Sequence, residues 1–447
     1  MNKGETFQVV ITGFDFEGLG VTRVDNFVVF VIQGVIGDEL LIKITNVKRN
    51  FAFAEIVEIK KASINRVKPF CQNFGKCGGC DLWHISYETQ LTFKSNLVKD
   101  TLKKIANLEI SGIKIFGHQG SFNYRNKVQI PFQEMNGQIV YGFYEKNSHL
   151  IVSLNNCQIQ DPIHEKILIS FKEIIQENKL SAYNEKLHSG LLRHLIFRKN
   201  LKNELMLILV INGRINKKIK DCLLELANYY PEIKSIYINL NPKRTNVILG
   251  QEMFHIFGKE VIIDSIDDLA FEISPDSFFQ INPYMTKTLY QEALKMADIS
   301  KDDIVVDCYS GIGTISLFLA KKAKYVYGIE IVKNAVLNAK NNSKLNKVEN
   351  IKFIEGDVPA KIGEILKKTR IDVIVFDPPR KGLGTELLSQ LIPYKIKKMI
   401  YISCDIKSAS KDIKYLFDNN YQIKEAVAFD MFPGTKHVES CFLLELK

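Results

Sequence analysis

The strongest constraint on the fold is an alternation of strand and helix patterns that runs from residue 286 to the end of the chain. Short apolar runs predict strands, and helices fill most of the gaps between them. The predicted strands cover 303–307, 325–330, 351–354, 371–376, 397–403, 421–428 and 440–446. This alternation indicates a doubly wound, Rossmann-like α/β domain. A short loop joins the last two runs, so we expect those two strands to pair antiparallel.

The chain is long enough for additional domains, because 447 residues correspond to two to four domains of ordinary size. No run of about 18 uncharged apolar residues is present, so no transmembrane helix is predicted. The segment Met1–Thr6 lacks an apolar stretch, so we predict no signal peptide and expect a cytoplasmic protein. We separately expect the protein to be a monomer. The formal net charge of +10 suits a polyanionic partner, although a composition rich in Lys, Ile and Asn also explains it.

The first 60 residues or so have the pattern of a small β domain. β-rich runs at 8–11, 27–31 and 40–44 are separated by glycine-containing turns. Five short strands in about 60 residues are typical of an OB-like β-barrel. Basic residues lie on or near its later strands: Lys43, Lys48, Arg49, Lys60 and Lys61. They either bind phosphates or form a solvated basic face.

The middle of the chain is predicted to be a mixed α+β domain that follows a cysteine-rich loop at 71–80. The segment 87–108 has the apolar spacing of a helix. Strand patterns then appear at 124–131, 204–210 and 235–239.

Three carboxylates follow successive predicted strands of the α/β domain. Asp307 precedes a loop, 308–314, whose two glycines allow a ligand to approach the backbone closely. Glu330 and Asp357 end the next two strands, where they could bind ribose hydroxyls and an adenine amino group. The loop lacks the third glycine of the dinucleotide fingerprint, and no P-loop lysine is present. These features favour S-adenosylmethionine over NAD as the cofactor.

A second group of residues carries reactive side chains. Asp377-Pro378-Pro379-Arg380 follows one predicted strand, and Cys404 follows the next. Ligands bind at the carboxyl ends of strands in open α/β sheets, so the Cys404 thiol can face the ligand as a nucleophile. A buried core cysteine is the alternative interpretation. Glu439, with His437 beside it, is a candidate general base.

These residue types match the needs of methylation at C5 of uracil. This ring carbon becomes nucleophilic only after a thiolate adds at C6, and it can then attack a sulfonium methyl group. A base must afterwards remove the C5 proton so that the thiol is eliminated. Cys404 and Glu439 supply candidates for these two roles.

The motifs resemble those of the RNA uracil-5-methyltransferase family over nearly the whole chain. Acid-Pro-Pro is a signature of S-adenosylmethionine-dependent methyltransferases, and Phe278–Asn282 is similar to a cofactor motif of the family. The resemblance implies Cys404 as the nucleophile and Glu439 as the base. It also implies these cofactor-binding residues: Gln280, Tyr309, Thr314, Glu330, Asp357 and Asp377. The chain departs from the family at Asp405-Ile406, where Asn-Pro is frequent, and at Thr314, where some members have Asn.

The same resemblance implies a domain organisation. Residues 1–62 resemble the TRAM domain, an RNA-binding barrel. A central domain is expected to comprise 63–84 and 119–265. A class I methyltransferase domain is expected to comprise 85–118 and 266–447.

The eight cysteines of this large chain indicate metal binding or catalysis rather than disulfides. Four of them form a cluster motif: Cys71, Cys77, Cys80 and Cys157. Their spacing alone does not separate zinc from a [4Fe–4S] cluster. Their arrangement resembles the cluster motif of the ribosomal RNA branch of the family, which implies a [4Fe–4S] cluster with a structural or RNA-contacting role. Of the remaining cysteines outside the active site, Cys222 and Cys441 are predicted to lie in hydrophobic cores, and Cys308 is predicted to pack beneath the cofactor loop.

The leading hypothesis is therefore methylation at C5 of a uridine in 23S ribosomal RNA. The nearest alternative is the same chemistry on transfer RNA. An iron–sulfur redox or radical enzyme that uses S-adenosylmethionine would need a cluster with three protein ligands, and the fourth cysteine, Cys157, argues against it. A catalytically silent RNA-binding protein is disfavoured because Cys404, Glu439 and Asp377 are all present.

Overall fold

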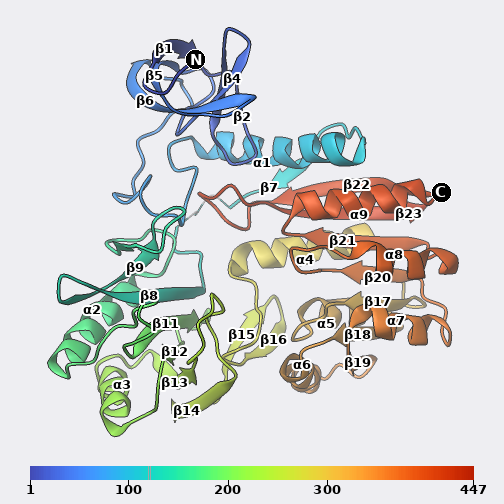
Figure 1. Cartoon of the computed structure of the whole chain (residues 1–447). Coiled ribbons are helices and arrows are strands. Elements are labelled where there is room, and N and C mark those ends of the chain that lie inside the picture. The colour runs from blue at the N-terminus through green and yellow to red at the C-terminus, as the bar shows by residue number, and fades with distance from the viewer. Residues whose placement is uncertain (119, 121) are drawn as a thin grey trace.

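The computed structural model describes residues 1–118, 120 and 122–447, so the predicted domain boundary at residue 119 lies outside the described residues. Figure 1 shows a small β structure at the N-terminus, a mixed region in the middle of the chain, and a large sheet flanked by helices. In the part of the chain that is described, no helix is long and apolar enough to cross a membrane.

The N-terminal strands form a six-stranded sheet in the order β1-β5-β6-β4-β3-β2. Its strands are β1 (Thr6–Val10), β2 (Gly13–Phe14), β3 (Gly20–Val24), β4 (Phe27–Val31), β5 (Glu39–Val47) and β6 (Phe51–Lys61). Hydrogen bonds link β3 back to the end of β1, because Thr12 N–H donates to Val21 O and Thr22 Oγ1 donates to Val10 O, both at 2.8 Å. The sheet therefore curls around its own apolar core. The sequence predicted five strands, and the two-residue β2 is too short to give a pattern.

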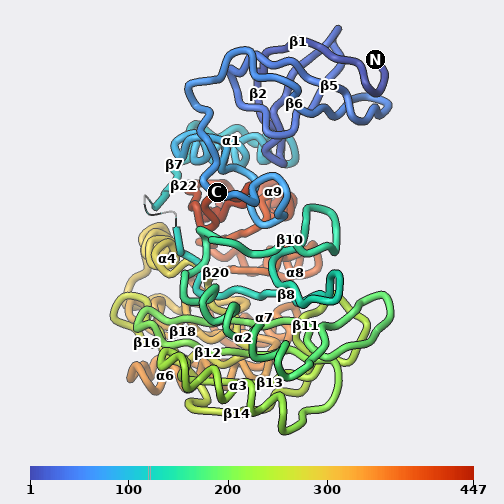
Figure 2. Tube along the Cα trace, turned by 90° about the vertical axis from the view of Figure 1, so that its left-hand side faces the viewer, coloured from blue at the N-terminus to red at the C-terminus, as the bar shows by residue number. Residues whose placement is uncertain are grey.

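Helix α1 (Tyr87–Thr101) lies between the N-terminal sheet and the large C-terminal sheet, as Figures 1 and 2 show. It continues as a π-helical turn, η1 (Leu102–Ala106), so the helix predicted at 87–108 is confirmed. The next strand, β7 (Lys114–Phe116), pairs in parallel with β22 (Tyr421–Phe429) at the edge of the C-terminal sheet.

The middle of the chain forms a seven-stranded sheet in the order β10-β9-β8-β11-β12-β13-β14. Its strands are β8 (Lys127–Met135), β9 (Gln138–Tyr144), β10 (Ile151–Ser153), β11 (Leu192–Lys199), β12 (Leu205–Ile211), β13 (Ile233–Leu240) and β14 (Glu252–Gly258). Helices α2 (Pro162–Glu177) and α3 (Lys217–Tyr229) share one hydrophobic core with one face of this sheet. The other face, which includes Ile196 and Ile208, belongs to a core shared with the C-terminal domain.

The strand predicted at 124–131 begins three residues later than expected. Arg125 N–H donates to Ile159 O (3.0 Å) and Asn126 N–H donates to Ile281 O (3.0 Å), so this backbone bonds to distant segments before it enters β8. A two-stranded hairpin, β15 (Ile262–Ile266) and β16 (Leu269–Ile273), then leads to the C-terminal domain.

The C-terminal sheet has eight strands in the order β19-β18-β17-β20-β21-β23-β22-β7. Its other strands are β17 (Ile304–Cys308), β18 (Tyr325–Glu330), β19 (Ile351–Glu355), β20 (Val373–Phe376), β21 (Lys398–Ser403) and β23 (Glu439–Leu446). The helices are α4 (Pro283–Ala297), α5 (Thr314–Ala320), α6 (Lys333–Leu345), α7 (Val358–Leu366), α8 (Gly384–Leu391), the short η2 (Ile392–Tyr394) and α9 (Ile406–Asp418).

Helices cover both faces of this sheet. Within β17, Val305 belongs to the core that contains α4 and α5, and Val306 belongs to the core that contains α7, α8 and α9. Successive strand residues point to opposite faces, so this split shows a doubly wound arrangement. Strands β22 and β23 pair antiparallel, as the sequence predicted. Cys222 and Cys441 are buried in the cores, also as predicted, and Cys308, at the end of β17 before the loop 309–313, is buried in a core as well.

Candidate active site

Five parallel strands end at one edge of the C-terminal sheet, and the predicted cofactor residues follow them. The registers align these ends, because Cys308 lies beside Ile329 and Phe376, and Glu330 lies beside Glu355. The carboxyl edge of such a sheet is where ligands bind in this fold class. The edge also borders the N-terminus of α4, which follows Gln280.

The loop after β17 takes a tight path that its sequence permits. Tyr309 has a φ of +67° and Gly313 a φ of +85°, so both lie in the left-handed region. A Cβ atom on Gly313 would come within 2.8 Å of the Phe353 ring, which restricts this position to glycine. Gly311 N–H donates to Glu330 Oε2 (3.0 Å), and Val332 N–H donates to Glu330 Oε1 (2.8 Å). Glu330 therefore fixes the loop that would face a bound nucleoside.

Thr314, at the start of α5, forms a hydroxyl–hydroxyl hydrogen bond of 3.0 Å with the buried Tyr290 of α4. Asp307 is also buried, and its Oδ2 accepts a hydrogen bond from Ser316 Oγ. Burial raises the pKa of Asp307 to about 7. Its Oδ1 has no hydrogen-bond partner among the described residues, so this carboxyl group has capacity for a ligand.

Gln280 and Asp357, two further residues of the predicted cofactor set, differ in their exposure to solvent. Gln280 is buried, and its backbone oxygen accepts a hydrogen bond from Asn126 Nδ2 (2.9 Å). Asp357 is exposed at the end of β19 and precedes α7, but its side chain makes no capping hydrogen bond to that helix. Asp357 therefore does not cap helix α7 through its side chain, which is the usual structural role of an acid at this position.

Cys404 and Glu439 are neighbours across an antiparallel strand pair. Ser403 lies opposite Ser440 in the pairing of β21 with β23, and Ser440 Oγ donates to Ser403 O (3.3 Å). Cys404 directly follows β21, and Glu439 is the first residue of β23. The antiparallel register thus brings together two residues that the sequence separates by about 35 positions.

Electrostatics connect this pair to Asp377 and Arg380. Burial raises the pKa of Cys404 to about 11, and the charges of Glu439 and Asp377 add to the effect, whereas Arg380 opposes it. Burial and the nearby Asp377 raise the pKa of Glu439 well above its ordinary value, and Arg380 again opposes the shift. Burial raises the pKa of Asp377 to about 7. Two close carboxyl groups thus favour a shared proton, while Arg380 favours the charged forms of the thiol and Glu439.

The loops that carry these groups are held by buried hydrogen bonds. Asp412 of α9 accepts from Tyr401 Oη (2.7 Å) and from Leu383 N–H (2.7 Å), which anchors the loop that follows Arg380. Asp405 accepts from Ser408 N–H (2.9 Å) and caps α9. This cap gives a structural role to Asp405, where the chain departs from the Asn-Pro of the family.

The segment 430–438, which leads into Glu439, is bonded to three other parts of the chain. Gly434 O accepts from the N–H groups of Asp81 and Leu82, both at 2.9 Å, and Gly434 N–H donates to Gln90 Oε1 (3.1 Å). Tyr124 Oη donates to Pro433 O (3.2 Å). The segment that leads into the general-base candidate is therefore held jointly by residues 81–82, by α1 and by Tyr124.

The four cysteines of the predicted cluster lie near one another. Cys80 interacts electrostatically with Cys157, Cys77 and Cys71, and burial raises its pKa to about 12. Burial likewise raises the pKa of Cys157 to about 11. However, among the described residues no group of three or more His, Cys, Asp or Glu side chains has an arrangement that could hold a metal ion. The structure gives the predicted iron–sulfur cluster no support beyond the proximity of these thiols.

Several residues of the site gave no clear signal in the sequence. Tyr290 lies within a helix whose apolar spacing is typical of packing, so its contact with Thr314 could not be anticipated. Lys94 is a lysine in the middle of α1, but it is fully buried beside Asp430. Asp307 was visible as an acid at a strand end, and only its unpaired buried oxygen singles it out for a ligand.

The fold and the site together define an α/β enzyme whose strand ends present a thiol beside two carboxyl groups. The sequence profile of the tRNA (uracil-5-)-methyltransferase family matches residues 86–447, and the TRAM domain profile matches residues 2–57. The chain therefore belongs to the tRNA (uracil-5-)-methyltransferase family and is an RNA uracil-5-methyltransferase.

Relatives cover the whole chain. An uncharacterized RNA methyltransferase of Caldanaerobacter subterraneus subsp. tengcongensis is 41% identical over 450 residues, which span 100% of both chains. One of Clostridium tetani is 39% identical and covers 99% of this chain and 97% of its own. Among solved structures, the tRNA (uracil-54, C5)-methyltransferase of Pyrococcus abyssi, in complex with S-adenosyl-L-homocysteine, has a TM-score of 0.77 at 28% identity. The match covers 98% of this chain and 100% of that one.

Proposed function

We propose that this enzyme transfers a methyl group from S-adenosylmethionine to C5 of a uridine in 23S ribosomal RNA, through a covalent bond between Cys404 and uracil C6. The observation that carries the proposal is the pairing of β21 with β23, which sets Cys404 beside Glu439 and near Asp377. The uridine of a folded RNA must leave its stack to reach this half-buried thiol.

S-adenosylmethionine supplies the electrophilic methyl group, and the protein supplies the binding site at the strand ends. We propose that six residues bind it: Gln280, Tyr309, Thr314, Glu330, Asp357 and Asp377. Glu330 and Asp357 are acceptors suited to ribose hydroxyls and an adenine amino group. The methyl donor in this role is consistent with the S-adenosyl-L-homocysteine bound to the related Pyrococcus abyssi enzyme.

The reaction requires two proton transfers in addition to the methyl transfer. The Cys404 thiol first gives its proton to solvent, and the thiolate sulfur adds to C6 of the uracil, which turns C5 into an enolate-like nucleophile. C5 then takes the methyl group, whose bond to the sulfonium sulfur breaks and leaves S-adenosyl-L-homocysteine. The Glu439 carboxylate removes the C5 proton, the C6–S bond breaks, and Cys404 returns as a thiolate. Arg380 assists both residues, because its charge favours the anionic forms that they need.

The choice between ribosomal and transfer RNA rests on different observations. The four cysteines resemble the cluster motif of the ribosomal RNA branch, which favours 23S ribosomal RNA. Transfer RNA is the second candidate, because the Pyrococcus abyssi neighbour, which matches 98% of this chain, is named as a tRNA (uracil-54, C5)-methyltransferase. The match to the Pyrococcus abyssi enzyme covers 98% of this chain and so includes the N-terminal sheet. The N-terminal sheet therefore does not indicate whether the substrate is ribosomal or transfer RNA.

Mapping 5-methyluridine in ribosomal and transfer RNA from a strain that lacks this gene distinguishes the substrates. Loss of one 5-methyluridine from 23S ribosomal RNA, restored by the wild-type gene and not by Cys404→Ala, is the expected result. Loss from transfer RNA alone selects the second candidate. An unchanged 5-methyluridine content in both RNAs contradicts the proposed function.

We also propose the predicted domain roles. Residues 1–62 would bind RNA through exposed basic side chains, while 63–84 with 119–265 and 85–118 with 266–447 form the central and methyltransferase domains. The basic residues are all exposed: Lys43, Lys48, Arg49, Lys60 and Lys61. Charge reversal at Lys48 and Arg49 should weaken RNA binding and reduce its dependence on salt concentration.

The [4Fe–4S] cluster is a separate proposal that rests on the four neighbouring thiols. A cluster sets its four thiolates farther apart than a single tetrahedral ion does, because the iron–sulfur core lies between them. Protein purified without oxygen should be brown and contain about four iron atoms per chain, as four-cysteine ligation of such a cluster requires. Cys80→Ser should remove both iron and colour, whereas the core variant Cys222→Ser should keep them. Colourless protein with one zinc, or with no metal, contradicts the cluster.

A further inference from the structure

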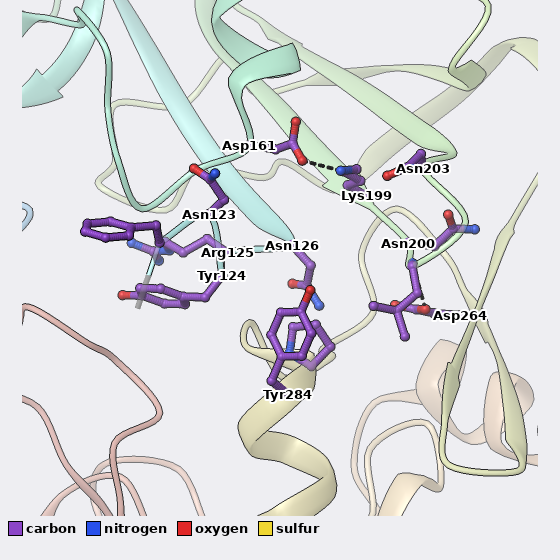
Figure 3. A pocket seen from close by; sticks show the side chains of 13 residues that line it. Asn123, Tyr124, Arg125, Asn126, Asp161, Lys199, Asn200, Asn203, Asp264 and Tyr284 are labelled. Atoms are coloured by element: carbon purple, nitrogen blue, oxygen red, sulfur yellow. Dashed lines mark hydrogen bonds and ion pairs between the residues drawn. The ribbon is translucent and has the colours of Figure 1, made fainter. Parts of the chain in front are cut away.

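A second pocket lies outside the predicted catalytic and cofactor sites. It is formed by residues 122–126, the turn 199–203 between β11 and β12, Asp264 of β15, and Tyr284 at the start of α4. Figure 3 shows these side chains around the pocket, with Tyr124 and Arg125 on one side and Asn200, Asn203 and Asp264 on the other. The cavity volume is about 330 Å³, which is large enough for a nucleobase and not for a folded peptide. Neither Cys404, Glu439 nor any predicted cofactor residue lines it.

The pocket contains an acceptor and a donor that the protein leaves unused. Asp264 is only 3% exposed, and its Oδ1 accepts from Leu201 N–H (3.0 Å) and Ser265 N–H (2.9 Å). Within the described part of the chain, its Oδ2 has no hydrogen-bond partner, and neither has the buried Nε of Arg125. Buried polar atoms without partners are rare, so the free acceptor Asp264 Oδ2 is suited to a ligand that carries a hydrogen-bond donor.

An exposed aromatic ring borders the pocket. Tyr284 is 52% exposed, and one side of its ring stacks on His118, with centroids 4.9 Å apart and an angle of 19° between the planes. RNA bases that have left their helical stack bind to such rings in proteins that recognise single-stranded RNA. The combination of a buried carboxylate and an exposed ring is therefore suited to a nucleobase.

One wall of this pocket is bonded to the active site. Tyr124 Oη donates to the oxygen of Pro433, in the segment that leads into Glu439. Asn126 donates through its side chain to Gln280 O (2.9 Å) and through its backbone to Ile281 O (3.0 Å). Residues of this wall thus contact both the pocket and the segments that carry Glu439 and Gln280. Extrusion of one uridine removes a stacking partner from its neighbours, which makes a nearby nucleotide available.

We propose that this pocket binds the base of a second RNA nucleotide close to the target uridine, and that it selects a base with an exocyclic amino group. The amino group donates to Asp264 Oδ2, and the ring of the base lies against Tyr284. This inference rests on the proposed RNA methylation and adds a recognition site for the sequence around the target.

The test uses full-length protein and RNA fragments that contain the methylated uridine, in which each flanking nucleotide in turn is made abasic. Asp264→Asn keeps the Oδ1 acceptor and replaces Oδ2 by a donor, while Tyr284→Ala removes an exposed ring. Both variants should raise KM for intact RNA about tenfold and leave kcat unchanged, since stacking and base contacts of this kind are worth about that factor. The control Asp302→Asn removes an exposed acid outside the pocket and should behave as wild type.

One flanking position should show coupling. At that position the abasic RNA should cost the wild type about tenfold in kcat/KM, and either variant should lose nothing further, because the same contact is already absent. Replacing only the amino group of that base by hydrogen should affect the wild type and not Asp264→Asn. Unchanged KM in both variants, or losses that multiply at every position, would overturn the inference. Wild-type protein that methylates no RNA would instead refute the proposed function itself.

Discussion

Lys94 and Asp430 form an ion pair that is completely buried, although 336 residues separate them in the sequence. Lys94 Nζ also donates to Phe432 O (3.0 Å), so the ammonium group bonds twice to the segment that precedes Glu439. Burial lowers the pKa of Lys94, and Asp430 opposes this shift. Helix α1 thus holds the segment that carries the general-base candidate.

Replacement of Lys94 by Met should therefore destabilise the protein strongly. The variant leaves the Asp430 carboxylate buried without a cation, which costs about 3–5 kcal/mol in the free energy of unfolding. The double variant Lys94→Met/Asp430→Leu should recover most of this loss. Lys99→Met, an exposed lysine on the same helix, should change stability by less than about 0.5 kcal/mol. Denaturant unfolding measures all three, and equal stability of Lys94→Met and Lys99→Met would show that the pair contributes nothing.

Gly434 of the same segment packs against Trp83, shortly after the cysteine-rich loop. Its φ is +77°, and a Cβ atom there would lie 2.1 Å from two atoms of the Trp83 ring. Gly434→Ala should cost about 2–4 kcal/mol, since it combines left-handed strain with steric overlap. Gly137→Ala is the matched control, because Gly137 has a φ of +75° with no atom within 4 Å of a Cβ position. Methylation should fall only in Gly434→Ala, and equal unfolding curves for both variants would contradict the packing argument.

Much of the site was predictable because parallel strands share one carboxyl edge. Asp307, Glu330 and Asp357 each end or follow an apolar run, so their gathering at one edge of the sheet needs only the strand assignments. The proximity of Glu439 to Cys404 depends instead on the antiparallel register of β23, which the sequence does not specify. Lys94 could not be predicted either, since a lysine in an amphipathic helix is ordinarily solvated and its partner comes from a distant segment.

The pH dependence of methylation should follow the deprotonation of Cys404. Burial and two carboxylates raise its pKa to about 11, so the thiolate is a minor form at neutral pH. A reaction that needs the thiolate speeds up as pH rises, so kcat/KM should increase about tenfold per pH unit between about pH 6.5 and 8.5. Glu439 also has a raised pKa and must be ionised to act as a base, which changes the rate in the same direction.

Arg380→Gln tests the electrostatic part of this pH argument. Loss of the guanidinium should raise the pKa of Cys404 further and lower kcat/KM at every pH in that range, while the increase with pH persists. Lys381→Gln, which removes the adjacent exposed cation, should leave the profile unchanged. A rate that is independent of pH in the wild type would show that thiol deprotonation does not limit the reaction.

Glu439→Gln should stop the reaction after methyl transfer. The amide cannot take the C5 proton, so methylated RNA should remain attached to Cys404 and migrate as a slow band in a denaturing gel. Binding of S-adenosylmethionine should persist, because the cofactor is proposed to bind at other strand ends. Release of free methylated RNA at the normal rate would assign the base elsewhere, with His437 the nearest candidate.

The most direct test of the account is covalent capture with RNA that carries 5-fluorouridine at the target position. Fluorine cannot leave as a proton does, so the wild-type enzyme should form a stable adduct in the presence of S-adenosylmethionine, and peptide mass spectrometry should place the RNA on Cys404. Cys404→Ala should form no adduct and no 5-methyluridine, while it still binds S-adenosylmethionine. An adduct on another residue, or near-normal methylation by Cys404→Ala, would contradict the central claim.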